Sequence, residues 1–268
     1  MKLVHWLAGM ACAVSLVGAA QAEPLKDAIK GDQRTPEYAA RDKYRHPAET
    51  LEFFQVKPDM TVVEIWPGGG WYTEILAPAL QDEGMFYAAH FPKDTDVGYF
   101  KRSREGFEKM LSKEKDTYGA VKLTEFAPGG DSEIAPKGSA DAVLTFRNVH
   151  NWMRGNNEQA AFQTFYEALK PGGVLGVVEH RAKPGTSRGD MVKSGYMTQD
   201  YVVKLAKNAG FELEESSEIN ANPKDSADHP KGVWTLPPSL RLGDEDKEKY
   251  LEIGESDRMT LRFRKPKS

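Results

Sequence analysis

The stretch VVEIWPGGGWY, residues 62–72, joins an apolar run to three consecutive glycines. The first half predicts a buried strand from Met60 to Ile65, and the glycines predict a tight turn into a helix. Glycines at such a turn let the backbone approach a ligand and aim the first amides of the helix toward it. Because tight turns also need glycine, it is the position between strand and helix that indicates a ligand-binding turn.

Short apolar runs alternate with helix-like segments along the rest of the chain. The predicted helices include one over residues 36–56, one capped by Asn156 with Glu158 in its first turn, and one that begins at Thr198. The predicted strands cover residues 60–65, 84–89, 140–146, 173–178, 211–219 and 258–264. This alternation predicts an α/β fold with a largely parallel sheet, and 268 residues suit one such domain.

Four segments together resemble the class I S-adenosylmethionine-dependent methyltransferases. VVEIWPGGGWYTEIL (62–76) looks like their glycine-rich first motif, and ADAVLTFRNVHNW (140–152) resembles their fourth strand and the following loop. EALKPGGVLGVVEH (167–180) and NAGFELEE (208–215) resemble the fifth strand with its preceding helix and the start of the sixth strand. The resemblance implies a Rossmann-like seven-stranded sheet of order 3-2-1-4-5-7-6, with strand 7 antiparallel and helices on both faces. Within this superfamily, the chain resembles a bacterial group of exported methyltransferase-like proteins.

The resemblance also implies that the glycine turn holds the methionine part of S-adenosylmethionine. Glu64 takes the acidic position of the motif, and Gly68 and Gly70 take its second and third glycines, with Gly69 between them. Trp66 stands where the family has its first glycine. Its side chain either offers an aromatic face to the sulfonium cation or packs under the sheet.

The nucleoside end of the implied site departs from the family pattern. His90 follows the second strand, where the family commonly has an acidic residue that binds the ribose hydroxyls. A neutral imidazole cannot grip a diol as a carboxylate does, so Asp94 or Asp96 is an alternative ribose ligand. Asp131 or Glu133 falls where the family contacts the adenine amino group. We expect His90 and Asp131 to contact the cofactor.

Two histidines follow neighbouring strands of the implied sheet, His150 after the fourth and His180 at the end of the fifth. We therefore expect them to lie close together at the ligand-binding edge. A general base, a metal ligand and a residue that fixes the loop are the three interpretations. A base would take the proton when an oxygen or nitrogen is methylated. The sequence has no H-x-E motif or pair of histidines at helical spacing, and no cysteine other than Cys12 that could supply a thiolate. The prediction therefore includes no metal.

The residues around His150 complete the predicted site. Arg147 and Asn148 are assigned to the methionine end of the cofactor, and His150 with Trp152 faces the acceptor; Arg147, His150 and Trp152 form the predicted catalytic set. The predicted function is methyl transfer from S-adenosylmethionine to a small or medium-sized acceptor by direct displacement. Positioning of the two reactants would supply most of the catalysis.

The N-terminus indicates export. Lys2 precedes an uncharged stretch over residues 6–20, and AQA at 20–22 matches a signal-peptidase site that is cleaved after Ala22. Residues 1–22 are the predicted signal peptide, and residues 23–268 form the single domain, periplasmic or secreted. The uncharged stretch is shorter than the roughly 20 residues that span a bilayer, so no stable membrane anchor is expected after cleavage. A formal net charge of −4 disfavours a nucleic-acid partner.

Two segments are predicted to cover the core of the domain: an N-terminal helical cover over residues 23–58 and a lid-like insertion over residues 220–257. Strands six and seven run in opposite directions in the implied topology, so the insertion between them lies on the ligand face. The alternative function is an exported binding module that kept the fold and uses the pocket for another ligand. The departures at Trp66 and His90 fit this alternative.

Overall fold

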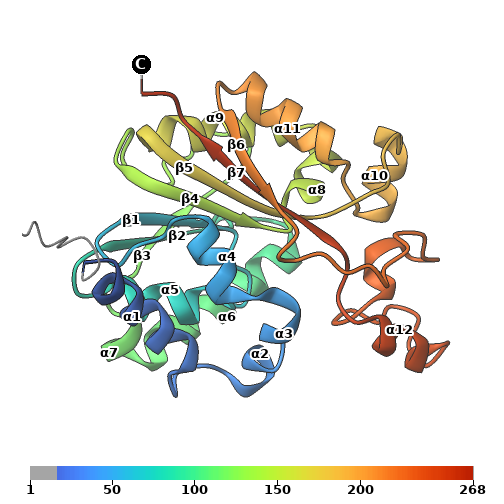
Figure 1. The fold of residues 1–268 in the computed structure, drawn as a ribbon, viewed down its shortest axis with the longest axis horizontal. Coiled ribbons are helices and arrows are strands. Elements are labelled where there is room, and N and C mark those ends of the chain that lie inside the picture. The colour runs from blue at the N-terminus through green and yellow to red at the C-terminus, as the bar shows by residue number, and fades with distance from the viewer. Residues whose placement is uncertain (1–16, 268) are drawn as a thin grey trace, which may run out of the picture.

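A seven-stranded sheet forms the centre of the fold in the computed structural model, which describes residues 17–267 (Figure 1). The strands lie in the order β3-β2-β1-β4-β5-β7-β6. Strands β1 to β5 pair in parallel, whereas β7 is antiparallel to β5 and β6. The strands are β1 Thr61–Ile65, β2 Met85–His90, β3 Lys122–Glu125, β4 Ala140–Phe146, β5 Leu169–His180, β6 Glu212–Ser217 and β7 Arg258–Arg264. The predicted strand order and antiparallel last strand are confirmed.

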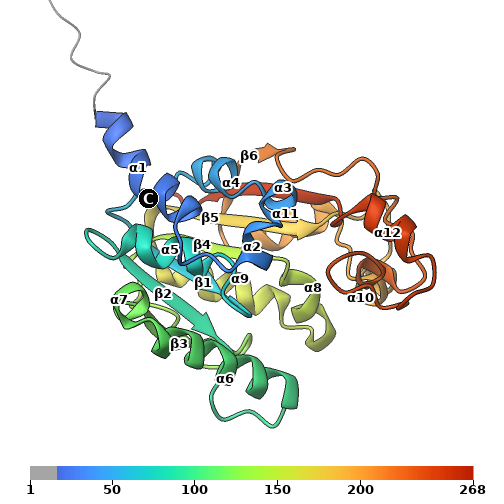
Figure 2. The same ribbon diagram turned by 90° about the horizontal axis from the view of Figure 1, so that it is seen from below.

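Helices cover both faces of the sheet, as Figures 1 and 2 show from two directions. Adjacent strand residues point to opposite faces, so Val62 joins one apolar core and Val63 the other. Both residues are fully buried, and burial on both faces explains the continuous apolar runs in the sequence. One core packs against α1 Val17–Lys30, α4 Pro47–Phe53, α5 Thr73–Leu80, α6 Gly98–Lys113 and α7 Lys115–Tyr118; the other packs against α8 Val149–Trp152, α9 Glu158–Ala168, α10 Arg188–Ser194 and α11 Gln199–Asn208.

The helix predicted over residues 36–56 consists of three short helices, and a proline stands at the second of the two breaks. The segment contains α2 Pro36–Ala39, α3 Asp42–Arg45 and then α4, which begins at Pro47. Proline is tolerated in the first turn of a helix but clashes with the preceding turn inside one. His46, directly before Pro47, takes a left-handed conformation with φ 42° and redirects the chain. The prediction of one continuous helix is therefore wrong.

Two helix starts differ in how well they follow the prediction. Thr198 caps α11 as predicted, since its hydroxyl accepts a hydrogen bond from the backbone N–H of Tyr201 at 3.3 Å. The N-cap of α9 is Asn157 and not Asn156, which instead adopts φ 55° after the short 3-10 helix η1 Met153–Gly155. Asn156 instead ends η1, so the helix starts one residue further along the chain than predicted.

The predicted lid over residues 220–257 is an irregular segment that contains the 3-10 helix η2 Gly232–Thr235 and α12 Lys247–Ile253. Figure 1 shows α12 in red, projecting beyond one end of the sheet. Val233 packs with Ala182 and Tyr196, so a small apolar cluster joins the segment to the chain between β5 and α11. Most of the predicted signal peptide, residues 1–16, lies outside the described residues. Among residues 17–267, no helix is both long and apolar enough to cross a membrane.

Candidate active site

A cavity of about 930 Å³ opens at the carboxyl ends of the parallel strands. Five parts of the chain line it: the glycine turn after β1, residues 91–100 after β2, the ends of β4 and β5 with α8, the segment around Arg41 and Arg45, and residues 233–256. Parallel α/β sheets bind ligands at this edge because the loops that follow the strands meet there. The volume lies at the upper end of the roughly 300–1,000 Å³ typical of small-molecule sites. Part of the predicted lid thus forms one wall of the cavity.

The glycine turn presents one of its glycines openly to this cavity. Gly68 has φ 61°, and a Cβ added there would meet no atom within 4 Å. Gly69 also lines the cavity, and its carbonyl accepts a hydrogen bond from the Tyr38 hydroxyl at 3.2 Å. Gly70 has φ 92°, but a Cβ on it would lie 2.9 Å from the side chain of Met110 on α6. Gly70 therefore packs against α6 and, unlike Gly68 and Gly69, does not line the cavity.

Trp66 has a packed face and a face toward the cavity. Its indole N–H donates to the carbonyl of Phe126 at 2.9 Å, and its ring centroid lies 4.6 Å from that of Phe91 and 5.5 Å from that of Phe100. Trp66, Phe91 and Phe100 all line the cavity. The two interpretations of Trp66 are thus compatible, because the hydrogen bond anchors the ring while part of its surface remains available to a ligand.

The two residues predicted to contact the nucleoside end do not line the cavity. His90 is fully buried, its Nε2 lies 3.1 Å from the Gly68 carbonyl, and its Nδ1 accepts from the backbone N–H of Phe91 at 2.8 Å. With both ring nitrogens engaged and the ring away from the cavity lining, His90 cannot bind a ribose. Asp131 is exposed and also lies outside the lining. Neither predicted residue therefore lies at the cavity, and the alternatives Asp94, Asp96 and Glu133 are likewise exposed and outside the lining.

Glu64 and Asn148 line the cavity where β1 and β4 end. Glu64 is buried and accepts a hydrogen bond from the Thr73 hydroxyl at 2.8 Å. Burial raises the pKa of Glu64 to about 7, although the Thr73 hydrogen bond and the Arg147 charge oppose the shift. The amide of Asn148 donates to the Ile65 carbonyl at 2.8 Å and so links the two strands. The amide nitrogen of Asn148 is thus used by the fold, and its oxygen is the atom left for a ligand.

His150 forms a dyad with a buried carboxylate that the sequence-based prediction missed. It lies on α8 directly after β4 and lines the cavity, and its Nδ1 is 3.1 Å from Oε1 of Glu179. The backbone N–H groups of His150 and His180 also donate to this carboxylate, at 3.3 and 2.8 Å. Because a carboxylate only accepts hydrogen bonds, the neutral His150 ring carries its proton on Nδ1 and leaves Nε2 as an acceptor.

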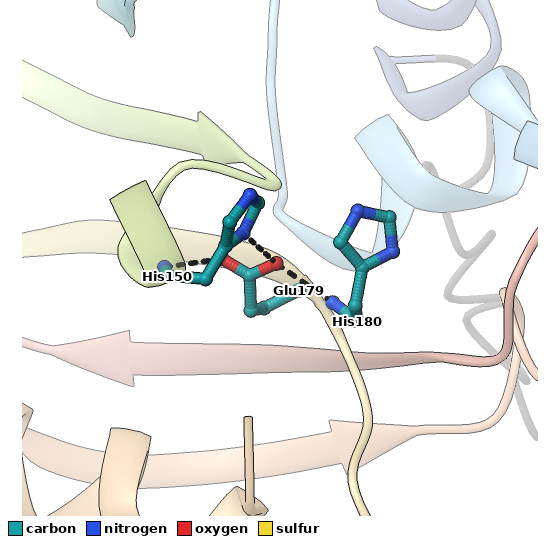
Figure 3. Close-up of side chains that lie close together, drawn as sticks. All are labelled: His150, Glu179 and His180. Atoms are coloured by element: carbon teal, nitrogen blue, oxygen red, sulfur yellow. Dashed lines mark hydrogen bonds and ion pairs between the residues drawn. The ribbon is translucent and has the colours of Figure 1, made fainter. Parts of the chain in front are cut away.

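The ring of His180 lies beside that of His150, with centroids 5.4 Å apart, as expected from the strand order. Figure 3 shows both rings on the same side of the Glu179 carboxylate, which lies near their bases. Burial, followed by the charges of His150 and Arg147, lowers the pKa of His180 well below 6.5. His180 is therefore neutral near pH 7, and its Nδ1 lies 2.5 Å from the hydroxyl of Ser256.

His150, Glu179 and His180 also form a candidate metal group, since each offers a ligand atom and these atoms lie within 4.8 Å of one another. The prediction included no metal. Both Glu179 oxygens already accept hydrogen bonds, and the positive charges of Arg147 and Arg258 act on His180. A divalent cation would have to displace those donors in cationic surroundings. The donor set thus favours proton transfer over metal binding.

Trp152 points away from the cavity. It is 2% exposed and packs edge-on against Phe126 and Phe165, with centroids 5.8 and 5.5 Å away. On a helix, residues two apart are rotated by about 200°, so His150 and Trp152 face opposite sides of α8. The prediction that Trp152 faces the acceptor is therefore wrong.

Three arginines surround one buried carboxylate beside the cavity. Glu255 pairs with Arg41 at 2.6 Å, with Arg45 at 3.2 Å and with Arg258 at 3.2 Å. Burial by itself would raise the pKa of Glu255, but the charges of Arg45, Arg258 and Arg41 outweigh it and lower the pKa to about 2. None of these residues was predicted, because an ion pair between positions 210 residues apart leaves no local pattern.

The sequence matches no protein-family model, and no curated protein is similar to it in sequence. Solved structures do share the fold. A SAM-dependent methyltransferase from Aquifex aeolicus has a TM-score of 0.57 and 14% identity, and the match covers 90% of this chain and 98% of that one. A putative sarcosine dimethylglycine methyltransferase from Galdieria sulphuraria has a TM-score of 0.58 and 14% identity, over 88% and 89% of the two chains.

The cyclase SpnF is similar to the same degree, with a TM-score of 0.58, 16% identity, and coverage of 92% of this chain and 93% of SpnF. The chain therefore has the class I methyltransferase fold. Because a structure named as a cyclase is among those with this fold, the fold by itself does not determine the reaction.

Proposed function

We propose that this protein transfers a methyl group from S-adenosylmethionine to a small or medium-sized acceptor bound in the same cavity. The observation that carries the proposal is the glycine turn, which follows β1 of a methyltransferase fold and leaves open space above Gly68 on the cavity side. The cofactor supplies an electrophilic methyl group on a sulfonium sulfur. The protein would hold the two reactants in line and exclude water.

The residues around the turn suit the methionine half of this cofactor. At Gly68 the backbone can approach a ligand that a side chain would exclude. Glu64 and the amide oxygen of Asn148 offer acceptors to an ammonium group at the same point. At the other half, Trp66, Phe91 and Phe100 offer aromatic faces to a purine. Ribose binding would then depend on backbone groups and water instead of an acidic side chain.

His150 is the residue that we assign to proton removal. Glu179 holds the proton of the neutral ring on Nδ1, so Nε2 can accept the proton that an oxygen or nitrogen acceptor loses as it is methylated. The carboxylate then balances the positive charge that forms on the ring. The neutral His180 beside it adds no repulsion, and its hydrogen bond to Ser256 ties β5 to the lid segment.

We also propose that the chain is exported, with cleavage after Ala22 and a mature N-terminus at Glu23, which places the enzyme in the periplasm or outside the cell. Intact-mass measurement on protein from the periplasmic fraction tests this. A dominant species that retains residues 1–22 would contradict cleavage.

Calorimetric titration of the purified protein with S-adenosylmethionine and its demethylated product tests the proposed cofactor. Transfer of label from the cofactor to components of a periplasmic extract then tests the reaction. We expect binding of both compounds and at least one labelled product. Absence of binding together with absence of transfer would refute the methyltransferase proposal and leave a binding module for another ligand.

A further inference from the structure

We propose that the methyl acceptor is a small anion whose carboxylate or phosphate group is bound by Arg147, with Arg154 and Arg241 at the mouth of the cavity. This inference rests on the proposed methyl transfer and concerns the second substrate of the same site. It follows from the charge of the cavity, from the surroundings of Arg147 and from the place of the two outer arginines relative to His150.

The cavity carries an excess of positive charge. Its lining includes five arginines and two carboxylates: Arg41, Arg45, Arg147, Arg154 and Arg241 against Glu64 and Glu255. The chain as a whole has a formal charge of −4, so the excess is local. Glu255 already forms ion pairs with three arginines, so it does not neutralise the other guanidinium groups of the lining. A low-dielectric cleft lined by one sign of charge concentrates ligands of the opposite sign.

Arg147 holds an unpaired guanidinium in this cavity. Within residues 17–267, no carboxylate oxygen lies within 4.0 Å of its nitrogens, whereas Arg45 and Arg258 each have an ion pair. Burial, and next the charge of Arg258, lowers the pKa of Arg147 to about 10, so the guanidinium is still charged near pH 7 but lacks a counter-charge. Its backbone adopts φ 61°, which is uncommon for a residue other than glycine and typical of functional sites. An anion at this point would offset the cost of burying the charge.

Arg154 and Arg241 hold a second anion-binding position next to the proposed base. Both guanidinium groups lie over the ring of Trp234, at 5.4 and 4.7 Å from its centroid. Stacking leaves the edges of a guanidinium, with their N–H donors, free to bind an oxyanion. In the part of the chain that the structure describes, neither arginine has a carboxylate partner. The ring centroids of Trp234 and His150 lie 6.0 Å apart. An acceptor held between Arg147 and this mouth would lie beside His150.

The charge of the cofactor adds an argument from complementarity. S-adenosylmethionine carries a carboxylate, an ammonium and a sulfonium group, and therefore has a net positive charge. A cationic cavity disfavours that charge unless the acceptor contributes a negative one. In the reaction the bond from sulfur to the methyl carbon breaks, a bond from the methyl carbon to the acceptor forms, and sulfur keeps the electron pair as a neutral sulfide. The proton of the acceptor passes to Nε2 of His150 and then to water.

Titration of the full-length protein with sodium benzoate, inorganic phosphate and the neutral analogue benzamide tests the inference without an assay of methyl transfer. We expect benzoate or phosphate to bind and benzamide to bind at least tenfold more weakly, since a charged hydrogen bond is worth about 1.5–3 kcal/mol. Which of the two anions binds more tightly distinguishes a carboxylate acceptor from a phosphorylated one. Arg147→Gln should weaken the binding of the tighter-binding anion at least tenfold. Arg102 is exposed and lies outside the cavity lining, so Arg102→Gln should leave that affinity unchanged.

The carboxylate of the cofactor is the competing partner for Arg147, so the titrations are repeated with saturating S-adenosylhomocysteine. Unchanged or tighter anion binding supports a separate acceptor site, whereas mutually exclusive binding overturns it. Equal affinity for benzoate and benzamide, no binding of either anion, or no effect of Arg147→Gln would also overturn it. Anion binding through Arg147 without any cofactor binding would uphold the anion site and refute the proposed methyl transfer, so the two failures are distinguishable.

Discussion

Glu179→Gln tests whether the buried carboxylate sets the proton position on His150. The side chain keeps its size but exchanges one oxygen for an NH₂ group. Glu179 accepts from Nδ1 of His150 at 3.1 Å and from two backbone N–H groups at 3.3 and 2.8 Å. A glutamine has one acceptor atom for these three donors, so at least one charge-assisted hydrogen bond is lost. We expect this to cost about 1.5–3 kcal/mol of stability, or roughly 3–12 °C in the unfolding midpoint.

The ring of His150 should respond directly. In the wild type, ¹⁵N NMR of labelled histidines at pH 8 should show the Nδ1–H form of His150, and in Glu179→Gln the Nε2–H form should become populated. His229, which pairs with Asp225 at 2.8 Å in the lid segment, is an internal control and should not change. A wild-type ring with its proton on Nε2, or a variant with an unchanged proton position, would refute the assigned tautomer.

Turnover gives the second readout of the same substitution. Once an acceptor is known, Glu179→Gln should lower kcat by roughly 100- to 10,000-fold, the range for a general base that is lost or held in the wrong tautomer. The affinity for S-adenosylmethionine should remain unchanged, because the dyad does not form the glycine turn. A variant that loses cofactor affinity and keeps kcat would show that Glu179 serves binding instead of proton removal.

Three further substitutions test the turn, the buried acid and the arginine cluster. Gly68→Val should abolish cofactor binding in calorimetric titration, whereas the control Gly185→Val should not. The two glycines are matched, since both have positive φ (61° and 82°) and no neighbour within 4 Å of an added Cβ. Equal effects of the two substitutions would contradict the role of the turn. Burial raises the pKa of Glu64 from 4.5 to about 7, so its contribution to stability is full below about pH 4.5 and is lost as the pH rises through 7. Urea denaturation should therefore show Glu64→Gln gaining stability relative to the wild type between pH 4.5 and 7, and a constant difference would contradict the raised pKa. Glu255→Gln should lower the free energy of unfolding by about 3–5 kcal/mol, since three guanidinium groups lose their counter-charge; in the same thermal melts the exposed Glu167→Gln should change little, and equal losses would contradict the buried network.

The strands were predictable where local pattern and burial agree. The bounds predicted for β4 and β7, residues 140–146 and 258–264, are those of the structure, because β4 is a mostly apolar run and β7 alternates apolar with polar residues. No strand was assigned to residues 122–125, which form β3 at the edge of the sheet. An edge strand has one neighbour and a wetter surface, so its sequence KLTE carries little of the apolar pattern.

The site was predictable only where chain order determines position. His150 and His180 follow neighbouring strands, so the implied topology alone predicted their proximity. The orientation of each side chain was not predictable: Trp152 turned to the core, His90 was enclosed by Gly68 and Phe91, and Asp131 stayed in solvent. Within a turn or a single helical turn, residues one or two positions apart face different directions, and packing against distant elements decides which one faces the ligand.

The sequence by itself determined the alternation of strands and helices, the glycine turn and, through resemblance, the strand order, because these depend on local periodicity and on steric limits of the backbone. The tertiary structure alone decided the dyad of His150 with Glu179, the cluster around Glu255 and the unpaired state of Arg147. Each depends on whether a charge finds a partner across the fold. In a cavity that excludes water, the presence or absence of that partner sets the protonation state of each group and the charge that a ligand must bring.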